Sequence, residues 1–262
     1  MGQIKVSANI LDKSLVVLNA LINSGCSQPL SEIAEKVNMP RQTVYRITHQ
    51  LERSGLVRKG IVTDEYSVGP QLRDLCFNVF SLMLRSLPVN GVLRNLVKDL
   101  GETCNLGILD CDEIVYLERV ECDWPLRLQF GPGSRVPVHA TAIGKLMLAY
   151  LPSRIRMRIF KSAPLKKFTD HTITDINELN IQLKKIRRQG FAVNSEENLV
   201  GMVAAAVPVH DKNRRVLAGL AVHVPVARMT AAEIEQYIPL LREASFKISD
   251  FLAETDNLNS KI

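Results

Sequence analysis

The sequence contains no long apolar segment, which excludes a helix that spans a membrane. Although 46% of the 262 residues are hydrophobic, no stretch approaches the roughly 20 consecutive apolar residues that such a helix needs. The N-terminal segment, MGQIKVSANILDKS, carries polar residues throughout and lacks the apolar core of a secretory signal. We therefore expect a cytoplasmic protein with no membrane partner, long enough for one large core and one smaller core.

Signatures of catalysis and of bound metals are also missing. The chain has no H-E-x-x-H, G-x-S-x-G, P-loop or GxGxxG motif. Its five cysteines include no C-x-x-C pair, and an odd number does not fit a closed set of disulfides, so we expect reduced thiols. No Cys/His spacing resembles that of a zinc site. We predict a protein that is not an enzyme, with no catalytic residue, no metal and no cofactor.

A domain with hydrolytic activity is the weaker alternative. The side chains that it would use are Glu196, Glu197, His139, His210, His223 and Cys104. Adjacent glutamates on a strand point to opposite faces, so Glu196 and Glu197 need not form an acid/base pair. No local motif supports a Cys104–His139 dyad.

Basic residues are concentrated near the N-terminus. Between Lys36 and Lys59 there are six basic residues and one acidic residue, a local charge of +5 against +6 for the whole chain. Such a patch is typical of a protein that binds a polyanion, although a basic run by itself is more often only a solvated surface. The structure expected around this segment therefore decides between a polyanion-binding patch and a solvated surface.

The first 53 residues show the periodicity of three helices. The first helix starts at Asn9, which can cap it, and ends before Gly25. We expect its inward face to consist of Leu11, Leu15, Leu18 and Ile22. Residues 31–37 and 41–53 predict the second and third helices, and Asn38-Met39-Pro40 separates them.

Two short β-rich runs, residues 56–58 and 65–68, follow the third helix and predict a hairpin. Three helices and a hairpin are typical of a winged helix-turn-helix, whose third helix enters the major groove of double-stranded DNA. We expect contacts to bases and phosphates from Arg41, Gln42, Thr43, Tyr45, Arg46, His49, Arg58 and Lys59. A winged helix that contacts only proteins is the alternative, and the local charge argues against it.

The rest of the chain predicts a linker helix and an α+β domain. Residues 71–87 are helical in pattern and have an apolar side that could pack against a partner chain. Further helices are predicted over residues 92–100, 141–150, 174–189 and 230–252. Strands are predicted over residues 103–109, 114–118, 126–130, 202–209 and 215–224. We expect the segment from Asp256 onward to fray.

Over residues 7–254 the sequence resembles the IclR family of bacterial transcriptional regulators. Thr43-Val44-Tyr45-Arg46 resembles the family's recognition helix, and Tyr66-Ser67-Val68-Gly69 the second strand of its wing. The most specific match is Pro-Val-His-Ala-Thr-Ala-Ile-Gly-Lys, residues 137–145, a hallmark of the effector domain. Later matches are Gly190-Phe191, Glu196-Glu197, Gly201, Val207-Pro208-Val209 and Pro225-x2-Arg228.

The resemblance implies that the C-terminal domain binds a small organic molecule in a cup on its sheet. The matching positions are Ala142, Ile143, Asn194, Ala204, Ala221 and His223. Because residues 141–144 open a predicted helix, free backbone N–H groups and the positive end of the helix dipole can face an anion there. We predict a carboxylate effector, such as a sugar acid, a keto acid or an aromatic acid.

Several positions depart from the family's pattern. The family commonly has Lys-Ser-Thr at residues 41–43, Cys-(Ile/Val)-Ala at 204–206, Asp at Asn194 and Ser-x-Ser at 221–223. The cup is therefore poorer in hydroxyl groups, and we expect a ligand different from the simplest keto acids. His223 could instead be a strand residue that faces solvent, and Asn194 a turn residue.

These patterns predict an α+β protein of two domains. We expect a winged helix-turn-helix over residues 1–70, a linker helix over 71–87, a GAF-like α/β effector-binding and oligomerisation domain with an antiparallel sheet over 88–254, and a tail over 255–262. One reading helix covers only a half-site, so we expect a homodimer or homotetramer on a pseudo-palindromic operator. The predicted function is ligand-controlled, sequence-specific regulation of transcription, with repression favoured over activation.

Overall fold

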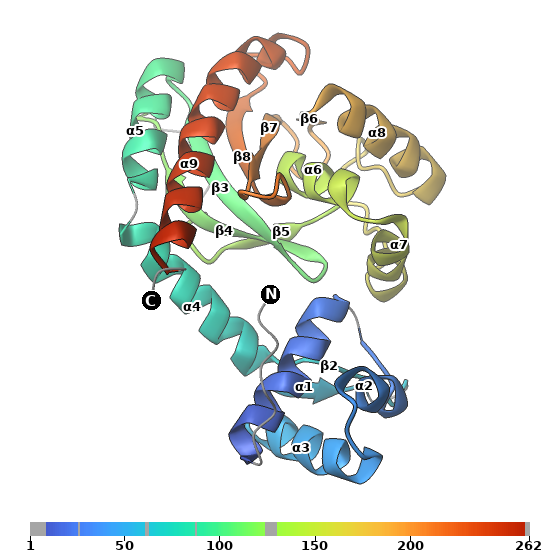
Figure 1. Ribbon diagram of the computed structural model, residues 1–262. Coiled ribbons are helices and arrows are strands. Elements are labelled where there is room, and N and C mark those ends of the chain that lie inside the picture. Colours follow the sequence, from blue (N-terminus) through green and yellow to red (C-terminus); the bar gives the residue numbers. More distant parts are fainter. Residues whose placement is uncertain (1–8, 26, 61–62, 87, 124–129, 260–262) are drawn as a thin grey trace. The chain divides into compact units, whose positions relative to one another are not determined.

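The computed structural model describes residues 9–25, 27–60, 63–86, 88–123 and 130–259. The chain divides into two compact units, Met1–Met83 and Leu84–Ile262, called here the N-terminal and C-terminal units (Figure 1). Each unit has a hydrophobic core of its own. Within the described ranges, no helix is long and apolar enough to cross a membrane.

The N-terminal unit contains the expected three helices and hairpin. The elements are α1 (Ile10–Ser24), α2 (Leu30–Val37), α3 (Arg41–Arg53), β1 (Val57–Lys59) and β2 (Tyr66–Val68). Asn9 caps α1 by accepting a hydrogen bond from the Leu11 N–H at 3.2 Å, and Gly25 ends it in the left-handed conformation. Helix α4 (Pro70–Ser86) follows, and the boundary between the two units lies within it.

The inward face of α1 differs from the prediction. Leu18 is buried as expected, but its buried neighbours are Val17 and Leu21. The other expected core residues, Leu11, Leu15 and Ile22, are 61%, 44% and 48% exposed. Because α1 is apolar around much of its circumference, periodicity alone offers two neighbouring stripes, and packing against α2, α3 and β2 selects one of them.

A tight turn orients α3. Asn38 ends α2 in the left-handed conformation, with φ of 50°, and Pro40 immediately precedes α3. Met39 packs against the core between them. Val44, Ile47 and Leu51 are buried as expected, and the opposite side of α3 is therefore exposed at the surface of the unit.

The C-terminal unit is built on a six-stranded antiparallel sheet in the order β5-β4-β3-β8-β7-β6. The strands are β3 (Thr103–Asp110), β4 (Glu113–Val120), β5 (Arg135–Pro137), β6 (Ala192–Ser195), β7 (Met202–His210) and β8 (Val216–Pro225). Helices α5 (Val89–Leu100) and α9 (Ile238–Asn259) lie on one face of the sheet (Figure 1). Helices α6 (Ala142–Tyr150) and α8 (Ile176–Gln189) lie on the other face.

The sequence missed three elements of this unit, namely α7 (Ser153–Ser162), β5 and β6. Both missed strands are short, so neither offers enough alternation to distinguish it from a loop. Asp175 rather than Thr174 caps α8, accepting a hydrogen bond from the Glu178 N–H at 2.8 Å. The strand expected over residues 126–130 lies almost entirely outside the described residues.

The C-terminal helix also differs from the prediction. Thr230 and Glu233 form the expected capping box, but a 3-10 turn (Glu233–Tyr237) follows it, and α9 starts only at Ile238. Pro239 explains this break, because proline is accommodated in the first turn of a helix and not in its interior. Helix α9 continues to Asn259, past the expected start of the tail.

Candidate functional site

The outward side of α3 is an exposed polar surface. Arg41, Gln42, Tyr45, Arg46 and His49 are exposed, as their expected role requires. Thr43 is half-buried. Gln50 and Arg53, which were not predicted as contact residues, are also exposed on α3 and complete the same side. A continuous set of donors on one helix can bond base edges and phosphates of DNA.

The two expected basic residues of the wing differ in their surroundings. Arg58 is exposed on β1. The Lys59 ammonium forms an ion pair with Asp64 at 2.5 Å, which raises the pKa of Lys59, and it lies 5.6 Å from the centre of the Tyr66 ring. Lys59 would therefore have to exchange Asp64 for a phosphate, whereas Arg58 is available directly.

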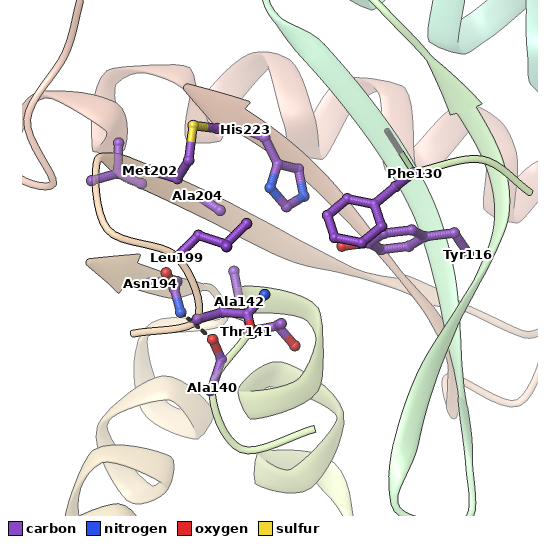
Figure 2. A pocket seen from close by; sticks show the side chains of 12 residues that line it. Tyr116, Phe130, Ala140, Thr141, Ala142, Asn194, Leu199, Met202, Ala204 and His223 are labelled. Atoms are coloured by element: carbon purple, nitrogen blue, oxygen red, sulfur yellow. Dashed lines mark hydrogen bonds between the residues drawn. The ribbon is translucent and has the colours of Figure 1, made fainter. Parts of the chain in front are cut away.

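A small cavity of about 30 Å³ lies in the C-terminal unit between the start of α6 and the sheet (Figure 2). Four expected residues line it: Ala142, Asn194, Ala204 and His223. The other lining residues are Tyr116, Phe130, Ala140, Thr141, Asn198, Leu199, Met202 and Val203. A cavity needs about 10–15 Å³ of such volume to hold one water molecule, so this one has room for only a few atoms, and an organic acid fits only if lining side chains move.

Two expected residues do not line the cavity. Ile143 is buried against the sheet, where a Cβ atom on Gly219 would come within 2.8 Å of its Cγ2 atom. Ala221 is fully buried in β8, opposite Asn105 and Ala206. Both positions were carried over from the family pattern, and in this chain they belong to the core that supports the cavity.

The start of α6 presents unpaired backbone donors. The Thr141 hydroxyl accepts a hydrogen bond from the Gly144 N–H at 3.2 Å and donates one to the Pro137 carbonyl at 2.8 Å. The N–H groups of Ala142 and Ile143 have no hydrogen-bond partner within the described ranges. Gly144 permits this close packing, because a Cβ atom there would overlap the Val138 carbonyl. The helix start can therefore bind an anionic oxygen.

His223 lies at the sheet side of the cavity and its Nε2 atom is buried (Figure 2). That atom has no hydrogen-bond partner in the described part of the chain. The imidazole packs edge-on against the Tyr116 ring, with centroids 6.3 Å apart. Burial, with a smaller effect of Arg119, lowers the pKa of His223 to about 3. The ring is therefore neutral near pH 7 and can exchange a hydrogen bond with a ligand.

Asn194 is part of strand β6 and pairs with Ala204 of β7, so the turn alternative is wrong. Its side chain is buried, and the Nδ2 atom donates a hydrogen bond to the Ala140 carbonyl at 2.5 Å. Asn194 therefore holds the segment that leads into α6 against the edge of the sheet. Its amide is partly committed to this structural contact.

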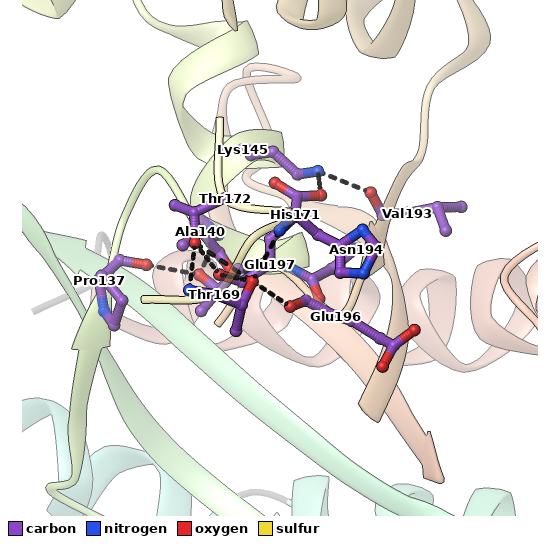
Figure 3. Close-up of polar contacts among 12 residues, drawn as sticks. Pro137, Ala140, Lys145, Thr169, His171, Thr172, Val193, Asn194, Glu196 and Glu197 are labelled. Atoms are coloured by element: carbon purple, nitrogen blue, oxygen red, sulfur yellow. Dashed lines mark hydrogen bonds and ion pairs between the residues drawn. The ribbon is translucent and has the colours of Figure 1, made fainter. Parts of the chain in front are cut away.

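A buried ion pair joins α6 to the turn after β6 (Figure 3). The Lys145 ammonium pairs with the Glu197 carboxylate and donates a hydrogen bond to the Val193 carbonyl at 2.8 Å. Burial lowers the pKa of Lys145, and the charge of Glu197 opposes that effect. Because the segment after Glu197 carries the lining residues Asn198 and Leu199, this pair joins α6 to a wall of the cavity.

The two adjacent glutamates lie in a turn after β6, not on a strand as expected. Glu196 has a φ of 57°, and its carboxylate accepts a hydrogen bond from the Gly201 N–H at 2.7 Å. The hydroxyls of Thr169 and Thr172 donate to the carbonyls of Glu196 and Glu197 at 2.7 and 2.6 Å (Figure 3). The Glu196 carboxylate therefore stabilises the turn, and the Glu197 carboxylate is paired with Lys145 of α6.

The groups that an enzyme would use are arranged for packing. Cys104 is buried on β3, and burial raises the pKa of its thiol. The His139 Nε2 atom is 3.0 Å from the Lys166 carbonyl, and its ring packs against Phe168. Across the described ranges, no three His, Cys, Asp or Glu side chains gather as metal ligands.

Comparison with known proteins places this chain in a family. Residues 10–60 match the IclR helix-turn-helix domain, and residues 84–250 match the C-terminal domain of bacterial IclR transcriptional regulators. The probable transcriptional regulator SauR of Cupriavidus necator is 43% identical over 226 residues, which cover 86% of this chain and 90% of SauR.

Solved structures agree with that relationship. The IclR crystal structure from Thermotoga maritima is 31% identical with a TM-score of 0.60 and covers 94% of this chain and 99% of that chain. The inducer-binding domain of an Acinetobacter PobR double mutant, in complex with 3-hydroxybenzoic acid, is 27% identical with a TM-score of 0.58. It covers 61% of this chain and 94% of that chain.

The chain belongs to the IclR family. It is a DNA-binding transcriptional regulator with a ligand-binding C-terminal domain, and its relatives are regulators rather than enzymes. The predicted fold class, a winged helix-turn-helix followed by an α/β domain with an antiparallel sheet, is confirmed.

Proposed function

We propose that this protein is a transcriptional repressor that an organic acid releases from its operator. The observation that carries the proposal is the cavity at the start of α6. The unpaired N–H group of Ala142, next to that of Ile143, lies at one side of it, and the buried Nε2 atom of His223 lies at the other. A carboxylate at the helix start and a hydroxyl or carbonyl group near His223 would satisfy both.

The aromatic wall of the cavity favours an acid with a flat or apolar body. Tyr116 and Phe130 pack edge-on with ring centroids 6.1 Å apart, and Leu199 and Met202 line the same cavity. A hydroxylated aromatic acid combines these features, and a PobR inducer-binding domain was crystallised with such a compound. We therefore place hydroxylated aromatic acids first among the candidate effectors, ahead of sugar acids and keto acids.

For DNA, we propose that Arg46, Gln42 and Arg41 of α3 contact base edges and that Thr43, Tyr45, His49 and the wing residues Arg58 and Lys59 contact the backbone. The exposed polar side of α3 supports this assignment. Each good contact of arginine or glutamine with a base contributes roughly 1–3 kcal/mol of discrimination.

We propose a homodimer, or a homotetramer made of such dimers, as the form that binds a pseudo-palindromic operator. Apolar side chains left exposed in the N-terminal unit support self-association: Ile10, Leu11 and Leu15 on α1, and Leu75 and Val79 on α4. Sedimentation of the full chain, and of a Leu75→Ser/Val79→Ser variant, would test this surface. An unchanged molar mass for the variant would exclude α4 from the interface.

Ligand entry needs a rearrangement, because the cavity holds only about 30 Å³. We propose that side chains of Leu199 and Met202 move as the acid binds, and that this change alters how the paired α3 helices are presented. The acid binds more tightly to the rearranged form than to the form that binds the operator. This difference in affinity supplies the coupling free energy, typically about 1–3 kcal/mol.

The proposal is tested in two steps. First, an operator is selected from random DNA with the full chain, and its symmetry is read from the enriched sequences. Second, hydroxybenzoates, sugar acids and keto acids are screened by thermal shift, and each hit is added to an operator gel shift. We expect a hit to stabilise the protein and weaken operator binding. A hit that strengthens operator binding would contradict the repressor assignment, and stabilisation that persists in His223→Ala would contradict the ligand pose.

A further inference from the structure

Helices α7 and α8 carry more positive charge than the winged helix-turn-helix. Residues 153–190 contain ten basic and three acidic side chains, a net charge of +7, against +5 for residues 36–59. The basic residues are Arg154, Arg156, Arg158, Lys161, Lys166, Lys167, Lys184, Lys185, Arg187 and Arg188. The net charge of residues 153–190 thus exceeds both that of residues 36–59 and the +6 of the whole chain. The DNA-reading segment is therefore not the largest source of positive charge.

This charge is left without acidic partners. Among these ten residues, which all lie in the described part of the chain, only Lys167 has a carboxylate within ion-pair distance, that of Asp170 at 2.7 Å. Arg154 and Lys161 on α7, and Lys184, Lys185 and Arg188 on α8, are exposed. Holding so many like charges on two neighbouring helices is unfavourable unless an anion offsets them.

Helices α7 and α8 also form a groove with donors that lack acceptors. The groove measures about 380 Å³ and is lined by Ser153, Arg156, Met157, Asn177, Asn180, Ile181 and Lys184. The Arg156 Nη1 atom donates to the Leu148 carbonyl at 3.3 Å, whereas its Nε atom is buried and has no partner among the described residues. Guanidinium, ammonium and hydroxyl groups therefore meet in one place, and none of the residues that line it is acidic.

The start of α7, where Ser153 lines the groove, adds backbone donors beside it. Pro152 precedes α7 and provides no side-chain cap. The N–H groups of Ser153 and Arg154 have no hydrogen-bond partner in the described ranges, since the first bonds to the Pro152 carbonyl come from Ile155 and Arg156. Free N–H groups at a helix start favour phosphate oxygens.

We infer that the α7–α8 surface, defined by the groove residues and the exposed basic residues beside it, is a second contact surface for DNA phosphates. DNA is favoured over an acidic protein because the groove contains no aromatic side chain of the kind that anchors protein interfaces. DNA is also favoured because the chain already binds it through the winged helix. That contact raises the effective concentration of neighbouring DNA phosphates at a second surface of the same chain.

The test compares two operators of the same sequence, one limited to the binding site and one extended by about 20 base pairs on each side. Both are titrated with the full chain over a range of salt concentrations. We expect the wild type to bind the long operator more tightly and with a steeper dependence on salt. Each phosphate contact contributes about 0.9 to the slope of log K against log salt.

The variant is Lys184→Gln/Arg188→Gln, which changes two exposed side chains on α8. We expect its slope on the long operator to fall by about 2 for each protomer that contacts the flanking DNA, with the short operator unaffected. The control is Arg94→Gln/Lys98→Gln, which removes the same charge from exposed positions on α5, on the opposite face of the sheet. We expect the control to keep the wild-type slope.

Three results would overturn the inference. If the Lys184→Gln/Arg188→Gln variant has the wild-type salt slope on the long operator, α8 makes no phosphate contacts. If the variant binds DNA normally but no longer regulates transcription by purified RNA polymerase, the surface contacts an acidic protein instead. A thermal shift with inorganic phosphate that the variant loses, without any change in DNA binding, would indicate a small-anion site. Failure of the wild type to bind the short operator would instead contradict the proposed operator recognition by α3.

Discussion

The polar side of α3 and the cavity beside α6 are built in opposite ways. The side chains of α3 that we propose for DNA contact lie on successive turns of one helix, and most of them are exposed. The cavity gathers residues from β4, the start of α6, β6, β7, β8 and the turn after β6, and most of its polar groups are buried. A surface for a large polyanion needs only charge on one face, whereas a cavity for a small molecule needs several segments to be fixed together. Four substitutions test this contrast.

The largest effect is expected for Lys145→Met, in the C-terminal unit. Removing the ammonium leaves the buried Glu197 carboxylate without its counterion. We expect the free energy of unfolding of this unit to fall by about 3–5 kcal/mol, measured by urea denaturation. Lys145→Met/Glu197→Leu should recover most of that loss, since it removes both charges. Lys184→Met, at an exposed position, is the control. Equal stability of Lys145→Met and the control would refute the role of the pair.

Arg46→Ala, in the N-terminal unit, should weaken operator binding and leave the stability nearly unchanged. Arg46 is exposed on α3, so its removal should change the free energy of unfolding by less than about 0.5 kcal/mol. Operator binding should weaken by about 1–3 kcal/mol, or roughly 5- to 150-fold, in a gel-shift titration. Lys98→Ala on α5 is a control for the lost charge. An operator affinity equal to that of the control would remove Arg46 from the reading surface.

His223 should make the stability of the C-terminal unit depend on pH. Its pKa is about 3 in the folded chain, below the ordinary value of 6.5. Below pH 6.5 the unfolded chain therefore binds a proton that the folded chain does not, and stability falls as the pH falls from 6.5 towards 3. At pH 5 the loss should be about 2 kcal/mol relative to pH 7.5.

His223→Gln should remove that part of the pH dependence, as measured by denaturation at both pH values. The pKa values of His139 and His210 are also lowered, mainly by burial, so a shallower dependence should remain. If the variant and the wild type lose the same stability between pH 7.5 and 5, the imidazole is not held neutral as described.

The smallest effect is expected for Asn9→Ala. This change removes the side-chain cap of α1 and should cost about 1 kcal/mol. We expect the loss in the N-terminal unit alone, seen as faster hydrogen exchange in α1, with no change in effector binding. Asn9→Asp, which keeps an acceptor at this position, is the matched control. Equal exchange rates in the two variants would mean that the cap does not stabilise α1.

The contrast between the two regions also explains which predictions succeeded. The helices of the N-terminal unit are marked by local signals, such as Asn9, Gly25 and the Asn38-Met39-Pro40 break, and these lie where the sequence analysis expected them. The inward face of α1 is not marked locally, because two apolar stripes compete and only packing selects Val17, Leu18 and Leu21.

In the cavity, family positions identified Ala142, Asn194, Ala204 and His223 but not the aromatic wall. Leu199 and Met202 flank Gly201, which the sequence analysis had noted, so their proximity to that motif was a usable signal. Phe130 lies shortly before the 137–145 motif and could have been considered, but Tyr116 lies far from every motif, and only the pairing of β4, β3 and β8 brings it to His223. The basic segment of α7 and α8 was visible as a count of charges and was missed because α7 was not predicted.

The sequence by itself determined the class of this protein, the order of its helices in the N-terminal unit and the polar side chains that α3 exposes. Those features depend on residues near each other in the chain, where helix periodicity and capping act. The tertiary structure alone decided which residues line the cavity, that Lys145 and Glu197 neutralise each other, and that α7 and α8 form one groove. These depend on contacts between distant segments, and such contacts form only when the sheet and its helices bury their apolar surface together.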